Sequence, residues 1–234
     1  MIKNSCFCFI CAVFLFACSR PISQNIGEQY LGAKYERNPL GEEKLPDDDP
    51  IIRFDAFDCV TFVETVLANG DEKELRKIRY KNGEIGFLTR NHFIESDWLE
   101  NNKDIVENVS DKYAYNLKTR TAIIDKQNWF KRVYDLDTNF SKRTVKIEYI
   151  PYDAIKSITT TKPLIVLFII DNPKIIDKIG SDLAIAHIGF LLPDGTFRHA
   201  SSRYGRVMDV NFYEYIQEIA KHKTNLGIAL LEIK

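Results

Sequence analysis

Apolar residues in the first half of the chain recur at helical spacing. After residue 58 they stand three or four positions apart, at Val60, Val63, Val66 and Leu67. This spacing predicts a helix that buries one face. A second helix is expected over about residues 72–80. Asn25 and Glu28 have the spacing of a capping box, which predicts a short helix and turn over residues 25–35.

The last third of the chain has a β pattern. Residues 164–170 form a continuous apolar run, as expected for a strand buried on both faces. Two further strands are predicted over residues 183–192 and 196–201, joined by a turn at Pro193-Asp194-Gly195. Residues 104–150 mix short β-like runs with helical and polar pieces. We interpret about residues 81–160 as a helical insertion in one α+β domain.

The N-terminal residues have the features of an export signal. One positive charge, Lys3, precedes an apolar run that is too short to cross a bilayer as a helix. The run ends Leu15-Phe16-Ala17-Cys18, which resembles the cleavage site of a bacterial lipoprotein. We predict a signal peptide over residues 1–17, lipidation of Cys18, a tether over residues 18–24, and a lipoprotein anchored to a membrane of the bacterial cell envelope and facing the periplasm. Cleavage without lipidation and a retained membrane anchor are the alternatives.

Cysteine usage leaves one thiol in the exported domain. Removing 17 of the 234 residues leaves 217, enough for a single domain with a sizeable core over residues 25–234. Cys6, Cys8 and Cys11 leave with the signal peptide and Cys18 would be lipidated, so Cys59 has no partner for a disulfide within the domain. A lone thiol in an oxidising compartment indicates either chemistry or an inert buried cysteine.

Charge gives no sign of a nucleic-acid partner. The net charge is −1, and no long block of one sign occurs. Basic residues between Lys73 and Lys81 alternate with acidic and apolar ones, which is typical of a solvated helix face. We expect a monomer without a cofactor or a metal ion.

Cys59 falls at the start of the first predicted helix. Asp58 is suited to cap this helix, so the thiol would lie in the first turn. Unpaired backbone N–H groups and the positive end of the helix dipole favour thiolate over thiol there. The position therefore predicts an acidic, reactive thiol.

The length of the turn decides how His187 and His199 are placed. If the turn holds three residues, Leu192 pairs with Thr196, and the two histidines are diagonal neighbours on one face, roughly 7–8 Å apart at the backbone. Two imidazoles can join across that distance by a hydrogen bond, and Gly189 would leave space between them. A turn of two or four residues would place them on opposite faces.

A thiol and two adjacent imidazoles fit a cysteine hydrolase. We expect His187, on the longer and more buried strand, to take the proton of Cys59, and His199 to hold the ring of His187 in the productive tautomer. Each histidine alone could equally be an ordinary core or surface group. Zinc bound by these three side chains is an alternative, but the wide separation in sequence disfavours it.

The segment 87–99 is dense in polar and aromatic groups. His92 and Trp98 could line a substrate groove or could close a core, and the sequence leaves both interpretations open.

These motifs resemble the NlpC-type cell-wall hydrolases, a papain-like superfamily. The resemblance rests on Phe57-Asp58-Cys59, Ala186-His187-Ile188-Gly189-Phe190 and Phe197-Arg198-His199-Ala200-Ser201. It implies a papain-like fold in which the nucleophile helix packs on a central antiparallel sheet. Leu31-Gly32-Ala33-Lys34-Tyr35 is similar to the segment that carries a tyrosine beside the nucleophile, which makes Tyr35 a candidate site residue, with Tyr30 as its competitor.

Other segments resemble a narrower branch, the N-acetylmuramoyl-L-alanine amidase-like lipoproteins. They are Val60 to Glu64, Arg90-Asn91-His92-Phe93, Asp97-Trp98 and His199-Ala200-Ser201-Ser202. The resemblance makes Asp58, Arg90, His92, Asp97, Trp98, Ser201 and Ser202 candidate substrate-binding residues. The chain departs from the superfamily at Val60-Thr61, where most members have Ser-Gly.

The resemblance implies hydrolysis of an amide bond in peptidoglycan or muropeptides. The expected bond joins N-acetylmuramic acid to L-alanine, and it would be cleaved through an acyl-enzyme. The alternatives are the bond between D-glutamate and the diamino acid of the stem peptide, and a lipoprotein that binds the cell wall without catalysis.

Overall fold

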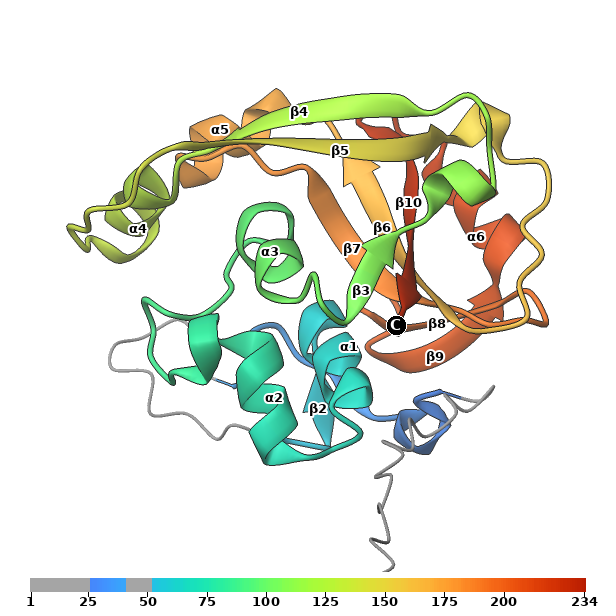
Figure 1. The fold of residues 1–234 in the computed structure, drawn as a ribbon, viewed down its shortest axis with the longest axis horizontal. Helices are drawn as coiled ribbons and strands as arrows, with labels where there is room; N and C mark the ends of the chain where they lie inside the picture. The colour runs from blue at the N-terminus through green and yellow to red at the C-terminus, as the bar shows by residue number, and fades with distance from the viewer. Residues whose placement is uncertain (1–25, 41–51) are drawn as a thin grey trace, which may run out of the picture.

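The apolar run at residues 164–170 forms the strand around which the molecule is built. The computed structural model describes residues 26–40 and 52–234 (Figure 1). In it β6 (Leu164–Ile170) is buried along its whole length. Ile165, Leu167 and Ile169 belong to the hydrophobic cluster on one side of the sheet, whereas Val166 and Phe168 belong to the cluster on the other. Both faces of this strand are therefore covered, as its sequence predicts.

The strands join in one ten-stranded sheet. Nine of them follow the order β2-β1-β9-β8-β7-β6-β10-β5-β4, and β3 also pairs with β10. The strands are β1 (Lys34–Tyr35), β2 (Ala56–Phe57), β3 (Val106–Asn108), β4 (Lys118–Ile124), β5 (Arg143–Pro151), β6, β7 (Ile185–Leu191), β8 (Thr196–Ser201), β9 (Arg206–Asn211) and β10 (Asn225–Ile233). Among the described strands, β1 and β2 pair in parallel and all the other pairs are antiparallel.

Helices cover both faces of this sheet (Figure 1). They are α1 (Cys59–Leu67), α2 (Glu72–Arg79), α3 (Leu99–Asn101), α4 (Lys126–Tyr134), α5 (Pro173–Ile179) and α6 (Phe212–Ile219). The apolar residues of α1 pack with the odd-numbered residues of β6, and Phe212 and Ile216 of α6 pack on the opposite face. None of the helices in the described ranges has the length and apolar character needed to cross a membrane.

A buried ion pair joins the first two helices. Glu64 of α1 accepts a hydrogen bond of 2.7 Å from Nε of Arg79, and the two side chains are only 2% and 1% exposed. Removing one partner of such a pair leaves a buried charge uncompensated, which costs about 3–5 kcal/mol. Arg79 is therefore an exception to the prediction of a solvated basic face on α2.

The prediction that residues 81–160 form a helical insertion is wrong, because this segment contains strands of the main sheet. β3, β4 and β5 all lie within residues 81–160, and they belong to the main sheet through their pairing with β10 and with each other. The predicted helix over residues 25–35 is only a 3-10 turn, Glu28–Tyr30, followed by β1. Asn25, the signal peptide, the tether and Cys18 lie outside the described residues.

Glu95 ties a π-helical turn to the sheet. This turn, Ile94–Trp98, places Oε1 of Glu95 2.6 Å from the backbone N–H of Ala184, which donates to it just before β7. Oε2 is buried and has no hydrogen-bond partner among the described residues. Burial, reinforced by the charges of Asp182 and Asp97, raises the pKa of Glu95 to about 7.

We predict that Glu95→Gln changes how stability depends on pH. The folded protein keeps this proton up to about pH 7, while the unfolded chain releases it near 4.5, so the wild-type free energy of unfolding falls as pH rises through that window. Glutamine does not titrate, and its amide oxygen can still accept from Ala184. Denaturant unfolding at about pH 5 and about pH 8 should therefore show the variant gaining stability over the wild type with rising pH. Parallel pH profiles for the two proteins would contradict this assignment.

Candidate active site

The start of α1 is fixed by a reciprocal cap. Oδ1 of Asp58 accepts a hydrogen bond of 2.7 Å from the backbone N–H of Thr61, and the Thr61 hydroxyl accepts one of 2.9 Å from the backbone N–H of Asp58. Cys59 is thus the first residue of the helix, as predicted. Its half-buried thiol also accepts from the backbone N–H of Ile188 on β7, next to His187.

The two histidines meet as the three-residue turn predicts. β7 and β8 pair Phe190 with Arg198 and Leu191 with Phe197, in the register expected from the sequence. The two rings lie on one face, and Nε2 of His187 is 2.7 Å from Nδ1 of His199. This contact leaves Nδ1 as the ring nitrogen of His187 that His199 does not engage.

Two details of the predicted hairpin are wrong. The strand of His187 is the longer one, as expected, but it is not the more buried: two of its seven residues are exposed or half-buried, against one of six in β8. Gly189 does not leave space between the imidazoles, because the Phe197 ring fills the space above it: a Cβ there would lie 2.6 Å from a ring carbon of Phe197. Phe197 in turn stacks on His199 with ring centroids 4.7 Å apart. The glycine thus positions His199 indirectly, through the phenylalanine.

Burial favours the uncharged forms of all three groups. It lowers the pKa of His187 to about 3, with a further contribution from His199, and lowers that of His199 to about 4 against the raising effect of Asp209. It also raises the pKa of the Cys59 thiol to about 12, and the charge of Asp58 adds to the shift.

The predicted bias of the helix start toward the thiolate is present, but it does not set the net direction of the pKa shift. Backbone N–H groups of Ile188, Cys59 and Val60 do lower the pKa of the thiol, as expected at a helix start, but desolvation outweighs them. The resting site holds a neutral thiol beside neutral imidazoles.

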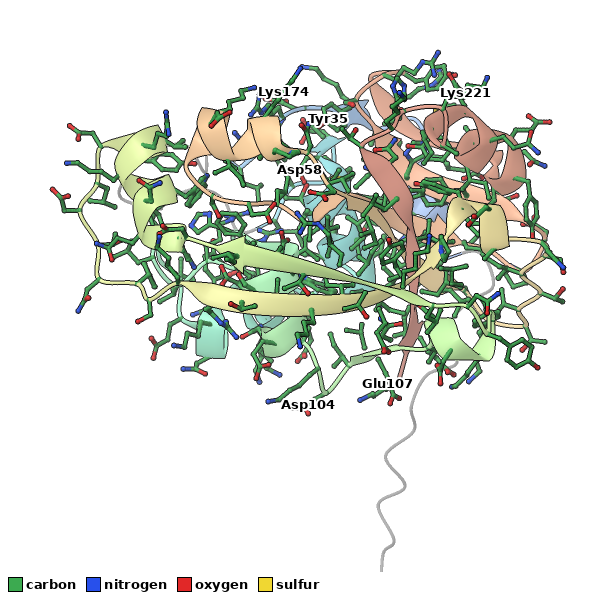
Figure 2. The ribbon with its side chains drawn as sticks, turned by 90° about the horizontal axis from the view of Figure 1, so that it is seen from above. Tyr35, Asp58, Asp104, Glu107, Lys174 and Lys221 are labelled. Atoms are coloured by element: carbon green, nitrogen blue, oxygen red, sulfur yellow. The ribbon has the colours of Figure 1, made fainter. Side chains whose placement is uncertain are left out.

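Of the two candidate tyrosines, Tyr35 lies beside the thiol. Burial, then the charges of Cys59 and Asp58, raise the pKa of Tyr35 to about 12. Figure 2 shows Tyr35 and Asp58 together at the side of the molecule opposite Asp104 and Glu107. Tyr30 is a core residue whose ring packs 5.2 Å from that of Phe57.

The aromatic segment after α2 closes a core. Trp98 is 1% exposed, and Nε2 of His92 lies 2.6 Å from the backbone oxygen of Phe87. Arg90 and Asp97 line a separate cavity of about 530 Å³ that includes none of the thiol and histidine residues. Lys126 pairs with Asp97 there at 2.8 Å. Of the two interpretations that the sequence left open, these contacts favour the closing of a core by His92 and Trp98.

The serines after His199 belong to the turn that follows β8. Ser201 is buried, and its hydroxyl accepts a hydrogen bond of 3.4 Å from the backbone N–H of Tyr204. Ser202 is exposed on the same turn. No contact among the described residues places Ser201 or Ser202 at the thiol.

One site residue was missed by the sequence analysis. Tyr215 of α6 has its ring centroid 5.0 Å from that of His199 and 6.4 Å from that of His187. Burial, then the charge of Cys59, raise its pKa to about 12. The amphipathic pattern of residues 212–219 could have predicted the helix, but nothing in that pattern indicates the site.

No metal centre accompanies these groups. Across residues 26–40 and 52–234, no group of three or more His, Cys, Asp and Glu is arranged to hold a metal ion. What the arrangement offers is a thiol, a base with a free nitrogen, and a second imidazole that orients the base.

A family model matches most of the chain. Residues 25–224 match the model of the AmiA-like family, described as N-acetylmuramoyl-L-alanine amidase-like. The chain belongs to this family. It is thereby an amidase-like member of the cell-wall hydrolases. No curated protein matches the chain.

Solved structures share the fold. A protein from Legionella pneumophila is 26% identical, with a TM-score of 0.80, covering 89% of this chain and 87% of its own. An N-acetylmuramoyl-L-alanine amidase from Bacteroides uniformis is 21% identical, with a TM-score of 0.68 and coverages of 90% and 98%. A protein from Bacteroides fragilis described as a putative xylanase is 23% identical, with a TM-score of 0.67 and coverages of 89% and 100%. One fold can host different chemistries, so the function of this chain depends on the residues of its site.

We predict that Asp58→Asn makes the thiol more acidic. Asparagine caps a helix as well as aspartate does, so the helix start should be kept while the negative charge that raises the pKa of Cys59 is removed. The measurement is the rate of Cys59 alkylation by iodoacetamide as a function of pH, whose midpoint should move to lower pH. Asp58→Ala is the control for the cap, because it should also cost about 1 kcal/mol of stability. An unchanged or higher midpoint in Asp58→Asn would contradict the prediction.

Proposed function

We propose that this protein is a cysteine amidase that hydrolyses the bond between N-acetylmuramic acid and L-alanine in peptidoglycan or muropeptides. The observation that carries the proposal is the contact of the Cys59 thiol with β7 immediately beside a histidine whose other ring nitrogen is held by His199. The family description supports an amide as the scissile bond. The order of nucleophile helix and histidine hairpin supports a place among the NlpC-type, papain-like hydrolases.

The first half of the reaction forms an acyl-enzyme. Nδ1 of His187 takes the proton of the Cys59 thiol as the sulfur attacks the lactyl carbonyl carbon of the muramic acid. The resulting imidazolium gives this proton to the nitrogen of L-alanine, and the carbon–nitrogen bond breaks. The stem peptide leaves as a free amine, and the muramoyl group stays on the sulfur as a thioester.

The second half returns the enzyme to its starting state. His187 takes a proton from water as the water oxygen attacks the thioester, and then returns it to the sulfur as the carbon–sulfur bond breaks. Backbone N–H groups of Cys59 and Val60 lie at the sulfur, so they are candidate donors to the oxyanion of both tetrahedral intermediates. The product is muramic acid with a free lactyl carboxylate.

The low pKa of His187 keeps the base unprotonated, but it also makes His187 a weaker acceptor for the proton of the thiol. A base must be unprotonated before it accepts a proton, and burial keeps His187 neutral over the whole range above about pH 3. The same burial makes the thiolate–imidazolium pair costly in the resting enzyme, so the proton is transferred as the carbonyl is attacked. The N–H groups around the sulfur reduce that cost at the moment the charge forms.

The N-terminal residues support a place in the cell envelope. We propose that Cys18 carries the lipid after residues 1–17 are removed, which would hold the amidase domain near its peptidoglycan substrate at a periplasmic membrane surface.

Product analysis tests the proposed bond. Defined muropeptides incubated with the protein should give an intact stem peptide that begins with L-alanine, together with the free sugar acid, as identified by mass spectrometry. A dipeptide left on muramic acid would instead assign the bond between D-glutamate and the diamino acid. Binding of muropeptides without any turnover would contradict an enzymatic function.

Variants of the three residues test their roles. Cys59→Ala and His187→Ala should each lower kcat by several orders of magnitude, since each removes a group that takes part in bond making. His199→Ala should keep partial activity, because an orienting group contributes less than the base it orients. His222→Ala is the matched control, since this histidine is exposed on the turn after α6 and should leave kcat unchanged. Equal activity of all four variants would refute the assignment.

A further inference from the structure

One ring nitrogen of His199 has no hydrogen-bond acceptor or donor around it. His199 is 99% buried, and its Nδ1 is joined to His187, but its Nε2 is enclosed by protein and has no hydrogen-bond partner among the described residues. A buried polar atom left in this way costs about 1–3 kcal/mol and calls for a physical explanation.

Three aromatic rings surround the imidazole of His199. Phe197 lies nearly parallel to it, at 29° and 4.7 Å between centroids, and so covers a face. His187 meets the Nδ1 edge. Tyr215 stands steeply to the imidazole, at 64° and 5.0 Å. A steep crossing of two rings sets the edge of one against the face of the other, and the edge of His199 that His187 leaves unengaged carries Nε2.

The protonation of Nε2 decides whether His187 can act as a base. If His199 carries its proton on Nε2, its Nδ1 is an acceptor, Nε2 of His187 donates to it, and Nδ1 of His187 keeps the lone pair that the proposed reaction needs. If His199 carries the proton on Nδ1, the chain of donors reverses and His187 has no lone pair toward Cys59. An aromatic face stabilises an N–H and does not stabilise a lone pair, so it selects the first arrangement.

We propose that Tyr215 is a positioning residue whose ring receives the Nε2–H of His199 and thereby fixes the tautomer of both histidines. This inference rests on the proposed amidase function for its kinetic consequence but not for the tautomer itself. It explains why a buried histidine can serve as the third member of the triad without a carboxylate or amide behind it.

The placement of Tyr215 fits this role. It lies on α6, which the Asn211 side chain caps by accepting from the N–H of Glu214 at 3.1 Å. Its ring also packs against Phe197, 5.1 Å away, so one phenylalanine touches both the tyrosine and His199. The hydroxyl makes no hydrogen bond to any described residue, which leaves the ring as the part that acts on the histidine.

Nitrogen-15 NMR of the imidazole side chains tests the proposal without a substrate. In the wild type, His199 should be the Nε2–H tautomer, and its Hε2 signal should be shifted upfield by the ring current of Tyr215. Tyr215→Phe keeps the ring and should preserve both features. Tyr215→Leu should move the signal downfield. Tyr213→Leu is the matched control on the same helix, since the Tyr213 ring packs on Phe212 and its hydroxyl accepts from the N–H of Ile158, away from the histidines.

Kinetics with muropeptides gives the second readout. Tyr215→Leu should lower kcat about twofold to fivefold, the effect of losing one N–H to π contact, with little change in KM. Tyr215→Phe should stay close to the wild type. A Tyr215→Phe variant as impaired as Tyr215→Leu would overturn the proposal, because the hydroxyl would then be the acting group.

The NMR outcomes are decisive even if one variant fails. An Nδ1–H tautomer in the wild type, or an Hε2 signal unchanged in Tyr215→Leu, overturns the proposal. If Tyr215→Leu does not fold, the tautomer and the upfield signal in the wild type and in Tyr215→Phe decide alone. A protein that shows the predicted tautomer but cleaves no muropeptide would overturn the proposed function and leave the role of Tyr215 intact.

Discussion

The hydrogen bond between Nε2 of His187 and Nδ1 of His199 is the contact on which the site depends. It exists because a three-residue turn sets the register of β7 against β8, and a shift by one residue would carry one ring to the other face of the hairpin. With Nε2 of His187 engaged, Nδ1 is the ring nitrogen left to take the proton of the thiol in the proposed reaction. The cap of α1 then needs only to deliver Cys59 to the same strand, where the N–H of Ile188 meets the sulfur.

Burial removes Cys59, His187 and His199 from water, and this desolvation is the largest cause of the pKa shift of each group. Burial drives the thiol and both imidazoles toward their neutral forms, so no isolated charge is left in the resting site. A proton that moves from sulfur to imidazole creates a pair of opposite charges with no change in net charge. Nε2 of His199 is likewise buried without a hydrogen-bond partner among the described residues, and the ring of Tyr215 lies 5.0 Å from the imidazole between centroids. The site therefore depends on precise packing around uncharged groups.

The parts of the fold that follow local rules could be predicted from the sequence. The cap at Asp58, the buried strand at residues 164–170 and the parity of the turn at residues 193–195 are each set by neighbouring residues, and each was confirmed. β-like runs within residues 104–150 were recognised, but their place in the main sheet was missed because β3 and β5 pair with β10, more than 70 residues away in sequence. Local periodicity contains no information about such pairing.

The same distinction holds for the site: features set by neighbouring residues could be predicted, and features set by tertiary contacts could not. Cys59, His187 and His199 were found together because each lies at an identifiable point of a short element, whereas His92 and Trp98 were ambiguous until their burial was known. The net acidity of Cys59 was also misjudged, since the helix start is visible in the sequence but the desolvation by distant elements is not. Tyr215 could not be predicted for the same reason, because α6 reaches the histidines only through the tertiary fold.

The most direct test of the account is to trap the covalent intermediate. Enzyme mixed with a muropeptide, quenched with acid within one turnover and digested should give a Cys59 peptide heavier by one muramoyl group, and His187→Ala should give none. Turnover of the muropeptide without any adduct on Cys59, under conditions in which thioesters survive, would contradict the claim that this thiol, activated by the paired histidines, is the nucleophile.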